Sequence, residues 1–208
     1  MAQVRPYRGV DASQRMAQRR RKLLEAGLDL LGGAPVPAEL TVRALCARSG
    51  LAARYFYESF ADKDAFVAAL FDQVVSDIAT TTQAAMAAAL PTEQTHAAMQ
   101  NIVRVVSEDA RLGRLLFSAH LTNPVVVRKR AESGALFALL SGQHARAALH
   151  LEDNESIAAA AHFVVGGVAQ TLSAWLFGEL RLRPAELATQ LGALIDQLGD
   201  PRLYRTDG

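Results

Sequence analysis

A short predicted helix at residues 53–60 carries different side chains on its two faces. Phe56 and Phe60 are four residues apart, so they share one face and can pack on a neighbouring helix. The opposite face presents polar side chains, namely Arg54, Tyr55, Glu58 and Ser59. An arginine can donate two hydrogen bonds to the edge of a guanine, and hydroxyl groups can reach phosphate oxygens. The residue types on this face therefore favour contact with DNA.

The segment before this helix predicts its partner. Within 42–49, the apolar residues Val42, Leu45 and Cys46 are spaced by three and one, which places them on one side of a helix. Gly50 follows where the chain must turn, and glycine adopts the left-handed conformation at low cost. Two short helices joined in this way predict a helix-turn-helix, although many αα-hairpins with no DNA-binding role share the spacing.

The detail of the segment resembles the TetR family of bacterial transcriptional regulators (TetR/AcrR type). That family has a threonine opening its second helix, a glycine at the turn, a tyrosine three residues before a phenylalanine, and a lysine three residues after it. The matching residues are Thr41, Gly50, Tyr57, Phe60 and Lys63. The segment 19–31 also resembles the family's first helix. The resemblance in motif covers residues 14–75, and beyond them it is one of length and helical pattern.

The resemblance implies roles for single residues. The expected base-facing residues are Ala53, Arg54 and Tyr55. The expected phosphate contacts are Thr41, Tyr57 and Lys63, assisted by Ser59. Arg43 stands where family members reach a base or the backbone. The family usually has serine or threonine where this chain has Ala52, and the missing hydroxyl removes a helix cap worth about 0.5–2 kcal/mol.

Two of these residues have simpler alternative roles. Arg54 could pair with Glu58 four residues along, but such a pair contributes only about 0.2–0.5 kcal/mol. A bidentate contact between arginine and guanine contributes about 1–3 kcal/mol of discrimination, so we expect Arg54 to contact DNA. Tyr57 can pack partly in the core of the helix-turn-helix and still reach a phosphate.

Charge is distributed unevenly along the 208 residues. Residues 1–63 hold eleven Lys or Arg and six Asp or Glu, a net charge of +5, whereas residues 64–208 hold eleven and fifteen, a net charge of −4. This asymmetry indicates that a nucleic-acid contact is confined to the front of the chain. Together with the family resemblance, it implies a DNA-binding head at 1–63 and a ligand-binding and dimerisation body at 64–208. Residues 1–12, with Arg5 and Arg8, are expected to form a flexible basic arm that contacts DNA or a loose solvated tail.

Composition narrows the class of protein. A single cysteine, Cys46, allows no internal disulfide, and no apolar run of about 18 residues lacks a polar break, so we expect a reduced, cytoplasmic protein without a transmembrane helix. The five histidines have no metal-ligand spacing, and no phosphate loop or nucleophile elbow is present. The sequence therefore predicts no metal, no cofactor and no enzymatic activity.

No segment shows the alternation of a β-strand, so the predicted fold is all-α with about nine helices, a three-helix head and a larger helical body. Beyond the helix-turn-helix, a first helix is expected at 13–31, with a buried stripe of leucines, and another helix after Asp62. The remaining helical segments are expected at 91–110, 112–120, 124–149, 154–180 and 184–198.

Two sets of residues in the body are candidates for binding. Small and apolar residues on the last two helices predict a homodimer interface, as in the family, or else packing within the chain: Ala158, Ala161, Val165, Gly166, Ala169, Leu191, Leu194 and Leu198. Apolar residues and two histidines are candidates for lining a ligand pocket, or else are core: Met99, Phe117, His120, Phe137, His162, Phe163 and Trp175.

These observations predict a TetR-type regulator, a repressor that a small, mostly apolar ligand releases from DNA. A homodimer would bind a near-palindromic double-stranded operator. Two alternatives stay open. One is a helical small-molecule-binding or enzymatic protein with an incidental basic head, and the other is a DNA-binding protein whose body only dimerises.

Overall fold

The computed structural model describes residues 12–34, 37–149 and 154–204. Within them the chain is all-α, as predicted, and forms nine α-helices and two short 3-10 helices. The α-helices are α1 (Ala12–Gly32), α2 (Val42–Ser49), α3 (Ala53–Ser59), α4 (Lys63–Ala88), α5 (Gln94–Glu108), α6 (Ala110–Phe117), α7 (Pro124–Leu149), α8 (Glu155–Leu176) and α9 (Pro184–Gln197). The 3-10 helices are η1 (Pro91–Glu93) and η2 (Pro201–Tyr204). Residues 1–11 of the predicted arm lie outside the described residues.

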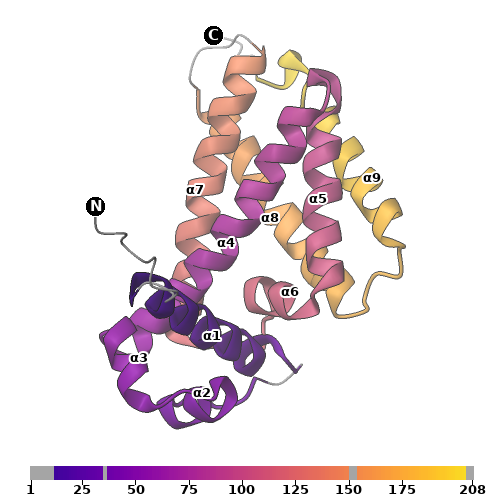
Figure 1. Cartoon of the computed structure of the whole chain (residues 1–208). Helices are drawn as coiled ribbons and strands as arrows, with labels where there is room; N and C mark the ends of the chain where they lie inside the picture. Colours follow the sequence, from indigo (N-terminus) through magenta and orange to yellow (C-terminus); the bar gives the residue numbers. More distant parts are fainter. Residues whose placement is uncertain (1–11, 35–36, 150–153, 205–208) are drawn as a thin grey trace, which may run out of the picture.

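Figure 1 shows α1, α2 and α3 gathered at one end of the molecule, with the long helices of the body running away from them. The helix starts predicted after Asp62, at residue 124 and next to residue 154 are confirmed. The side chains of Asp62, Asn123 and Asn154 each accept a hydrogen bond from a backbone N–H in the first turn of α4, α7 and α8, at 2.7, 3.0 and 3.0 Å. Each cap satisfies a donor that the helix itself cannot pair.

Several helix boundaries in the body differ from the prediction, and among them α6 spans Ala110–Phe117 rather than 112–120. The helix expected at 91–110 starts with a 3-10 turn, and α5 ends at Glu108 because Asp109 has extended backbone angles (φ −132°, ψ 95°). The carboxylate of Asp109 then caps α6 by accepting from the N–H of Arg111 at 3.0 Å. Helix α8 ends at Leu176, before the expected residue 180, and Gly178 follows with a left-handed φ of 82°.

The core of the head continues into the body. The predicted leucine stripe of α1 is buried, and three phenylalanines pack around it, with ring centroids 4.9–5.6 Å apart for Phe56, Phe60 and Phe66. Burying each such ring contributes about 1.5–3 kcal/mol. The same cluster includes Leu115 of α6 and Val126 of α7. The head is therefore packed directly onto the body rather than joined to it by a free linker.

A second core lies inside the body. It is formed mainly by α5, α8 and α9, with Val103, Val106, Leu172 and Leu187 each exposing no more than 1% of their surface. Helix α9 packs on α5, whereas α8 packs mainly on α7. By length and composition α8 would pass as a membrane span, with a mean hydropathy of 1.4, yet only 17% of that window is buried. Much of its apolar surface is therefore uncovered.

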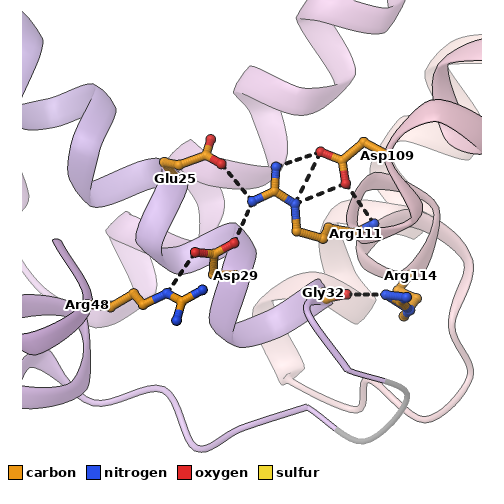
Figure 2. A network of polar contacts seen from close by, with 7 residues as sticks. All are labelled: Glu25, Asp29, Gly32, Arg48, Asp109, Arg111 and Arg114. Carbon is orange, nitrogen blue, oxygen red and sulfur yellow. Dashed lines mark hydrogen bonds and ion pairs between the residues drawn. The ribbon is translucent and has the colours of Figure 1, made fainter.

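Polar contacts also join the head to the body (Figure 2). The guanidinium of Arg111 on α6 lies between Asp109 and the acidic residues of α1, and it donates to Glu25 at 2.6 Å and to Asp29. Asp29 also accepts from Nε of Arg48 on α2 at 2.7 Å. Close by, Arg114 donates to the carbonyl of Gly32 at 2.7 Å. Helix α6 is thus bonded to the end of α1 and, through Asp29, to the helix-turn-helix.

The pKa values of this network follow from its geometry. Partial burial alone would raise the pKa of Asp29, but hydrogen bonds and charge from Arg48 and Arg111 outweigh it and lower that pKa below its ordinary value. The hydrogen bonds from Arg111 likewise lower the pKa of Asp109, and they outweigh its partial burial. Both carboxylates are therefore held in the charged form.

Candidate nucleic-acid interface

The hairpin of α2 and α3 has the geometry that its sequence predicts. The hydroxyl of Thr41 caps α2 by accepting from the N–H of Ala44 at 3.0 Å. Gly50 ends α2 with a φ of 69°, so the left-handed turn is present where glycine was expected. At Ala52 no side chain caps α3, in line with the missing hydroxyl. Phe56 and Phe60 are buried in the core and hold one side of α3 against it, so the opposite face of α3 is directed outward.

That outward face carries a connected cluster. Nη2 of Arg54 donates to the hydroxyl oxygen of Tyr55 at 2.6 Å, and the Arg54 guanidinium lies 4.6 Å from the centre of the Tyr55 ring. The guanidinium of Arg19 on α1 lies 3.9 Å from the same ring centre. Arg19 also pairs with Glu58 at 3.6 Å. Tyr55 therefore contacts two arginines, one from its own helix and one from α1.

This arrangement differs from the alternative role of Arg54, a pair with Glu58 four residues along. Arg54 donates a hydrogen bond to its neighbour Tyr55, and Glu58 instead pairs with Arg19. The contact between Arg19 and Tyr55 was not predicted, because the two residues are 36 positions apart and no local spacing signals it. The run of basic residues on α1 was the available hint. A second member of it, Arg20, lies 4.5 Å from the centre of the Phe60 ring.

The other residues expected to contact DNA differ in their exposure. Tyr57 is 62% exposed, and its ring meets that of Phe56 edge-on with the ring centroids 5.3 Å apart, so the ring packs against the core while most of the side chain stays accessible. Arg43, Ala53 and Lys63 are exposed, and Thr41 and Ser59 are half-buried. Because a hydroxyl has one donor and two acceptor positions, Thr41 can cap α2 and still donate to a phosphate.

The expected pocket residues do not converge in the body. Met99 is buried in the second core, and Phe117 and Trp175 pack against that core. His120 is exposed and meets the Phe177 ring edge-on at 6.0 Å, and Phe137 is half-buried on α7. His162 and Phe163 face outward on α8, where Phe163 is 72% exposed. These seven residues therefore do not form one pocket.

The hollow best placed for a ligand on the described part of the body is an open depression of about 360 Å³ between α5, α6, α8 and the start of α9. Trp175 lines it, together with five residues that the sequence did not indicate: Val106, Ser107, Ala110, Leu176 and Pro184. Nε1 of Trp175 donates to the carbonyl of Leu182 at 2.8 Å, which fixes the indole at the edge of this hollow.

The expected dimer residues separate into buried and accessible positions. Ala161 and Leu191 are only 6% and 4% exposed, because the first packs toward α7 and the second against α5, so they are removed from any interface. Ala158 and Gly166 are exposed on α8, and Leu194 is 55% exposed on α9. The last three members are half-buried, namely Val165, Ala169 and Leu198.

No family model and no curated protein matches the sequence. Solved structures do match. A TetR-family regulator from Syntrophomonas wolfei superposes with a TM-score of 0.72 at 14% identity, over 88% of this chain and 95% of the other. The chain has the TetR-type fold.

Two further structures share this TetR-type fold. The fatty acid degradation regulator FadR from Bacillus halodurans superposes with a TM-score of 0.70 at 13% identity, over 85% of this chain and 94% of the other. FadR from Bacillus subtilis, in complex with stearoyl-CoA, gives a TM-score of 0.64 at 12% identity, over 84% of this chain and 96% of that protein. The neighbours of this TetR-type chain are transcriptional regulators, and their likeness lies in the fold.

Proposed function

We propose that the chain is a DNA-binding transcriptional regulator of the TetR family that acts as a repressor in the cytoplasm. The observation that carries the proposal is the outward face of α3, where an exposed Arg54 and a half-buried Tyr55 lie together on a helix-turn-helix. The fold shared with solved regulators supports it. Arg54 and Tyr55 would read base edges in the major groove, with Ala53 close against the bases.

The phosphate backbone would be held by the exposed Arg43, Tyr57 and Lys63 and by the half-buried Thr41 and Ser59. Phosphate contacts fix the register of the protein on DNA, whereas base contacts give the specificity. In this proposal the head comprises residues 1–63 and the body residues 64–208. Two heads in a homodimer would occupy successive major grooves about 34–36 Å apart on a near-palindromic operator.

The dimer surface that we propose lies on α7 and α8 rather than on the last two helices. Leu136, Leu139 and Leu140 on α7 are 52%, 59% and 47% exposed, and Phe163 on α8 is 72% exposed. By contrast, α9 uses its apolar face within the chain, against α5. Exposed apolar groups on two packed helices form the kind of patch that a partner covers.

A second copy of the chain suits this surface. After Glu155, α8 has no Asp, Glu, Lys or Arg, so two copies can meet without repulsion between like charges. Beside the projecting Phe163, a Cβ added at Gly166 or Gly167 would meet nothing within 4 Å. Projecting and flat parts lie together on one face, which is the self-complementarity that a two-fold interface requires.

Sedimentation equilibrium of matched variants tests this surface. We expect the wild-type chain to be a dimer, Phe163→Asp to be a monomer, and Leu194→Asp on α9 to stay dimeric. The reverse pattern would place the interface on α9. A monomeric wild-type chain that binds phospholipid vesicles would assign the α8 face to a membrane instead.

The ligand in this proposal is a small, mostly apolar molecule bound by the body. The hollow beside Trp175 has a volume of about 360 Å³, near the lower end of the range of ligand sites. Because one TetR-type neighbour was solved with stearoyl-CoA, the first panel of compounds includes long-chain acyl-CoA thioesters, of which only the acyl chain is apolar, beside smaller apolar compounds. Trp175 is the single tryptophan of the chain, so its fluorescence reports directly on this hollow.

Release from DNA requires that the ligand bind one arrangement of the heads better than the other. We expect a true effector to change Trp175 fluorescence and to weaken operator binding over the same concentration range. A compound that changes Trp175 fluorescence but does not weaken operator binding is a ligand without a regulatory effect. If no compound in a broad apolar panel does either, the body serves only for dimerisation.

Selection of genomic DNA fragments by the purified protein, repeated at several salt concentrations, tests the DNA-binding proposal. We expect enrichment of one inverted repeat, with affinity that falls steeply as salt rises. Arg54→Ala should lose the preferred sequence, whereas Arg128→Ala, on the exposed surface of α7, should keep it. Weak, sequence-indifferent binding by the wild-type protein would refute the proposal.

A further inference from the structure

Four side chains from two helices form one connected path on the DNA-facing side of the head. Glu58 pairs with Arg19, Arg19 lies over the ring of Tyr55, and the hydroxyl of Tyr55 accepts a hydrogen bond from Arg54. Arg54 is exposed, so its long side chain has many rotamers open to it when it has no partner. Through Tyr55 and Arg19, the path connects the Arg54 side chain to α1, which lies outside the helix-turn-helix.

The geometry at Arg54 leaves its recognition capacity intact. A guanidinium has five N–H donors in a planar fork, and the bond to Tyr55 uses one of them, at Nη2. The remaining donors are available to the two acceptors of a guanine edge. The hydroxyl proton of Tyr55 is also available, because its oxygen acts as the acceptor toward Arg54. The bond to Tyr55 therefore orients Arg54 without occupying it.

The position of Tyr55 depends in turn on Arg19. The Arg19 guanidinium lies 3.9 Å from the centre of the ring, closer than that of Arg54 at 4.6 Å, and it reaches the ring from a different helix. Glu58 contacts the same guanidinium at 3.6 Å and limits its movement. The attraction between a cation and an aromatic face favours the ring orientation that keeps the two in contact.

We propose that Arg19 is a specificity-determining, positioning residue, which holds Tyr55 and through it the guanidinium of Arg54 in the orientation that reads DNA. This inference rests on the proposed function. It predicts that Arg19 contributes to the choice between base pairs and not only to general attraction toward phosphate. A lysine or arginine that merely contacts phosphate lowers affinity for all sequences alike when it is removed.

The experiment measures the affinity of the full-length protein for its selected operator and for operators with single base-pair substitutions. The base pair that Arg54 reads is the one whose substitution in the operator weakens binding by the wild-type protein but not binding by the Arg54→Ala variant. At that base pair we expect Arg19→Ala to lower discrimination by about five- to tenfold, part of the range set by a bidentate arginine–guanine contact. The control is Arg21→Ala, which removes the same charge from an exposed position on the same helix. It should keep the wild-type discrimination.

Two further variants separate positioning from structure. Tyr55→Phe keeps the ring under Arg19 but removes the acceptor for Arg54, so it should lose the same discrimination as Arg19→Ala while the head stays folded. The double variant Arg19→Ala/Arg54→Ala should discriminate no worse than Arg54→Ala alone, because both residues act on one contact. Thermal melts of each variant check that the head is intact.

The outcomes distinguish the two proposals. A wild-type protein that selects no sequence refutes the proposed function, and this inference with it. A wild-type protein with a defined operator, whose Arg19→Ala variant loses affinity equally for every sequence, keeps the proposed function and overturns the role of Arg19. Unchanged discrimination in Tyr55→Phe overturns it as well, because the hydroxyl would then not orient Arg54.

Discussion

Replacing Arg111 with alanine tests whether the polar network between head and body stabilises the fold. The substitution leaves Asp109 without its charged partner, removes the link to Glu25, and leaves Asp29 with Arg48 alone. Arg111 is 29% exposed, and the carboxylates of Asp29 and Asp109 are 21% and 30% exposed. The network is thus shielded only in part from solvent.

The expected free-energy change follows from that shielding. An exposed ion pair contributes about 0–1 kcal/mol, whereas breaking a fully buried one costs about 3–5 kcal/mol. Glu25, which is 59% exposed, adds little. We therefore expect Arg111→Ala to lower the free energy of unfolding by about 2 kcal/mol. In a chain of 208 residues this corresponds to a decrease in Tm of about 4–8 °C.

The pH dependence gives a second, independent readout. The pKa values of Asp29 and Asp109 lie below the ordinary carboxyl value of 3.8 in the folded state, so near that pH the unfolded chain binds more protons than the folded chain. Their contribution is complete above the ordinary value and is lost as pH falls through the lowered, folded-state values. The difference in Tm between wild type and Arg111→Ala should therefore be full at pH 7 and shrink below about pH 4.

Thermal unfolding monitored by circular dichroism, at one protein concentration for all variants, measures both effects. The matched control is Arg128→Ala, which removes an exposed pair with Glu132 at 3.5 Å and should change stability by less than about 1 kcal/mol. An unchanged Tm for Arg111→Ala at pH 7 would refute the reasoning. So would a difference in Tm of the same size at pH 3.

Three further substitutions probe single local features, each measured as a change in the free energy of unfolding. Ala52→Ser supplies the missing cap of α3, and we expect it to stabilise the head by about 0.5–2 kcal/mol. Gly50→Ala has free space for its Cβ but must keep a φ of 69°, so we expect a loss of about 1–2 kcal/mol from backbone strain alone. Gly113→Ala places a Cβ 2.5 Å from a methyl group of Leu176, and we expect overpacking to cost about 1–3 kcal/mol.

The parts of the fold that were predictable are those with local signals. The caps at Asp62, Asn123 and Asn154, the turn at Gly50 and the buried stripe of α1 each depend on residues within one or two turns of one another. A cap pairs backbone N–H groups at the start of its own helix, and a buried stripe follows the apolar period of its own helix. Such features can therefore be recognised before the tertiary structure is known.

Features that depend on distant packing were not predictable. The body contains several alanine-rich helices with similar apolar faces, and nothing in their spacing tells which neighbour each face meets. Leu191 and Phe163 both lie on such helices, yet the first is buried against α5 and the second is 72% exposed. The contact between Arg19 and Tyr55 joins two helices in the same way and was missed for the same reason.

Helix α6 is held at both ends, and this sets a condition on any regulation through it. Beside the contacts of Arg111 with α1, the half-buried Arg130 of α7 donates to the carbonyls of Leu115 and Ser118 at 2.7 and 2.8 Å, at the C-terminal end of α6. A ligand that moves the head by breaking the Arg111 network must supply about the 2 kcal/mol assigned to it. Since about 1.4 kcal/mol corresponds to a factor of ten, the ligand must bind the rearranged state about thirtyfold more tightly than the state in which the Arg111 network is intact.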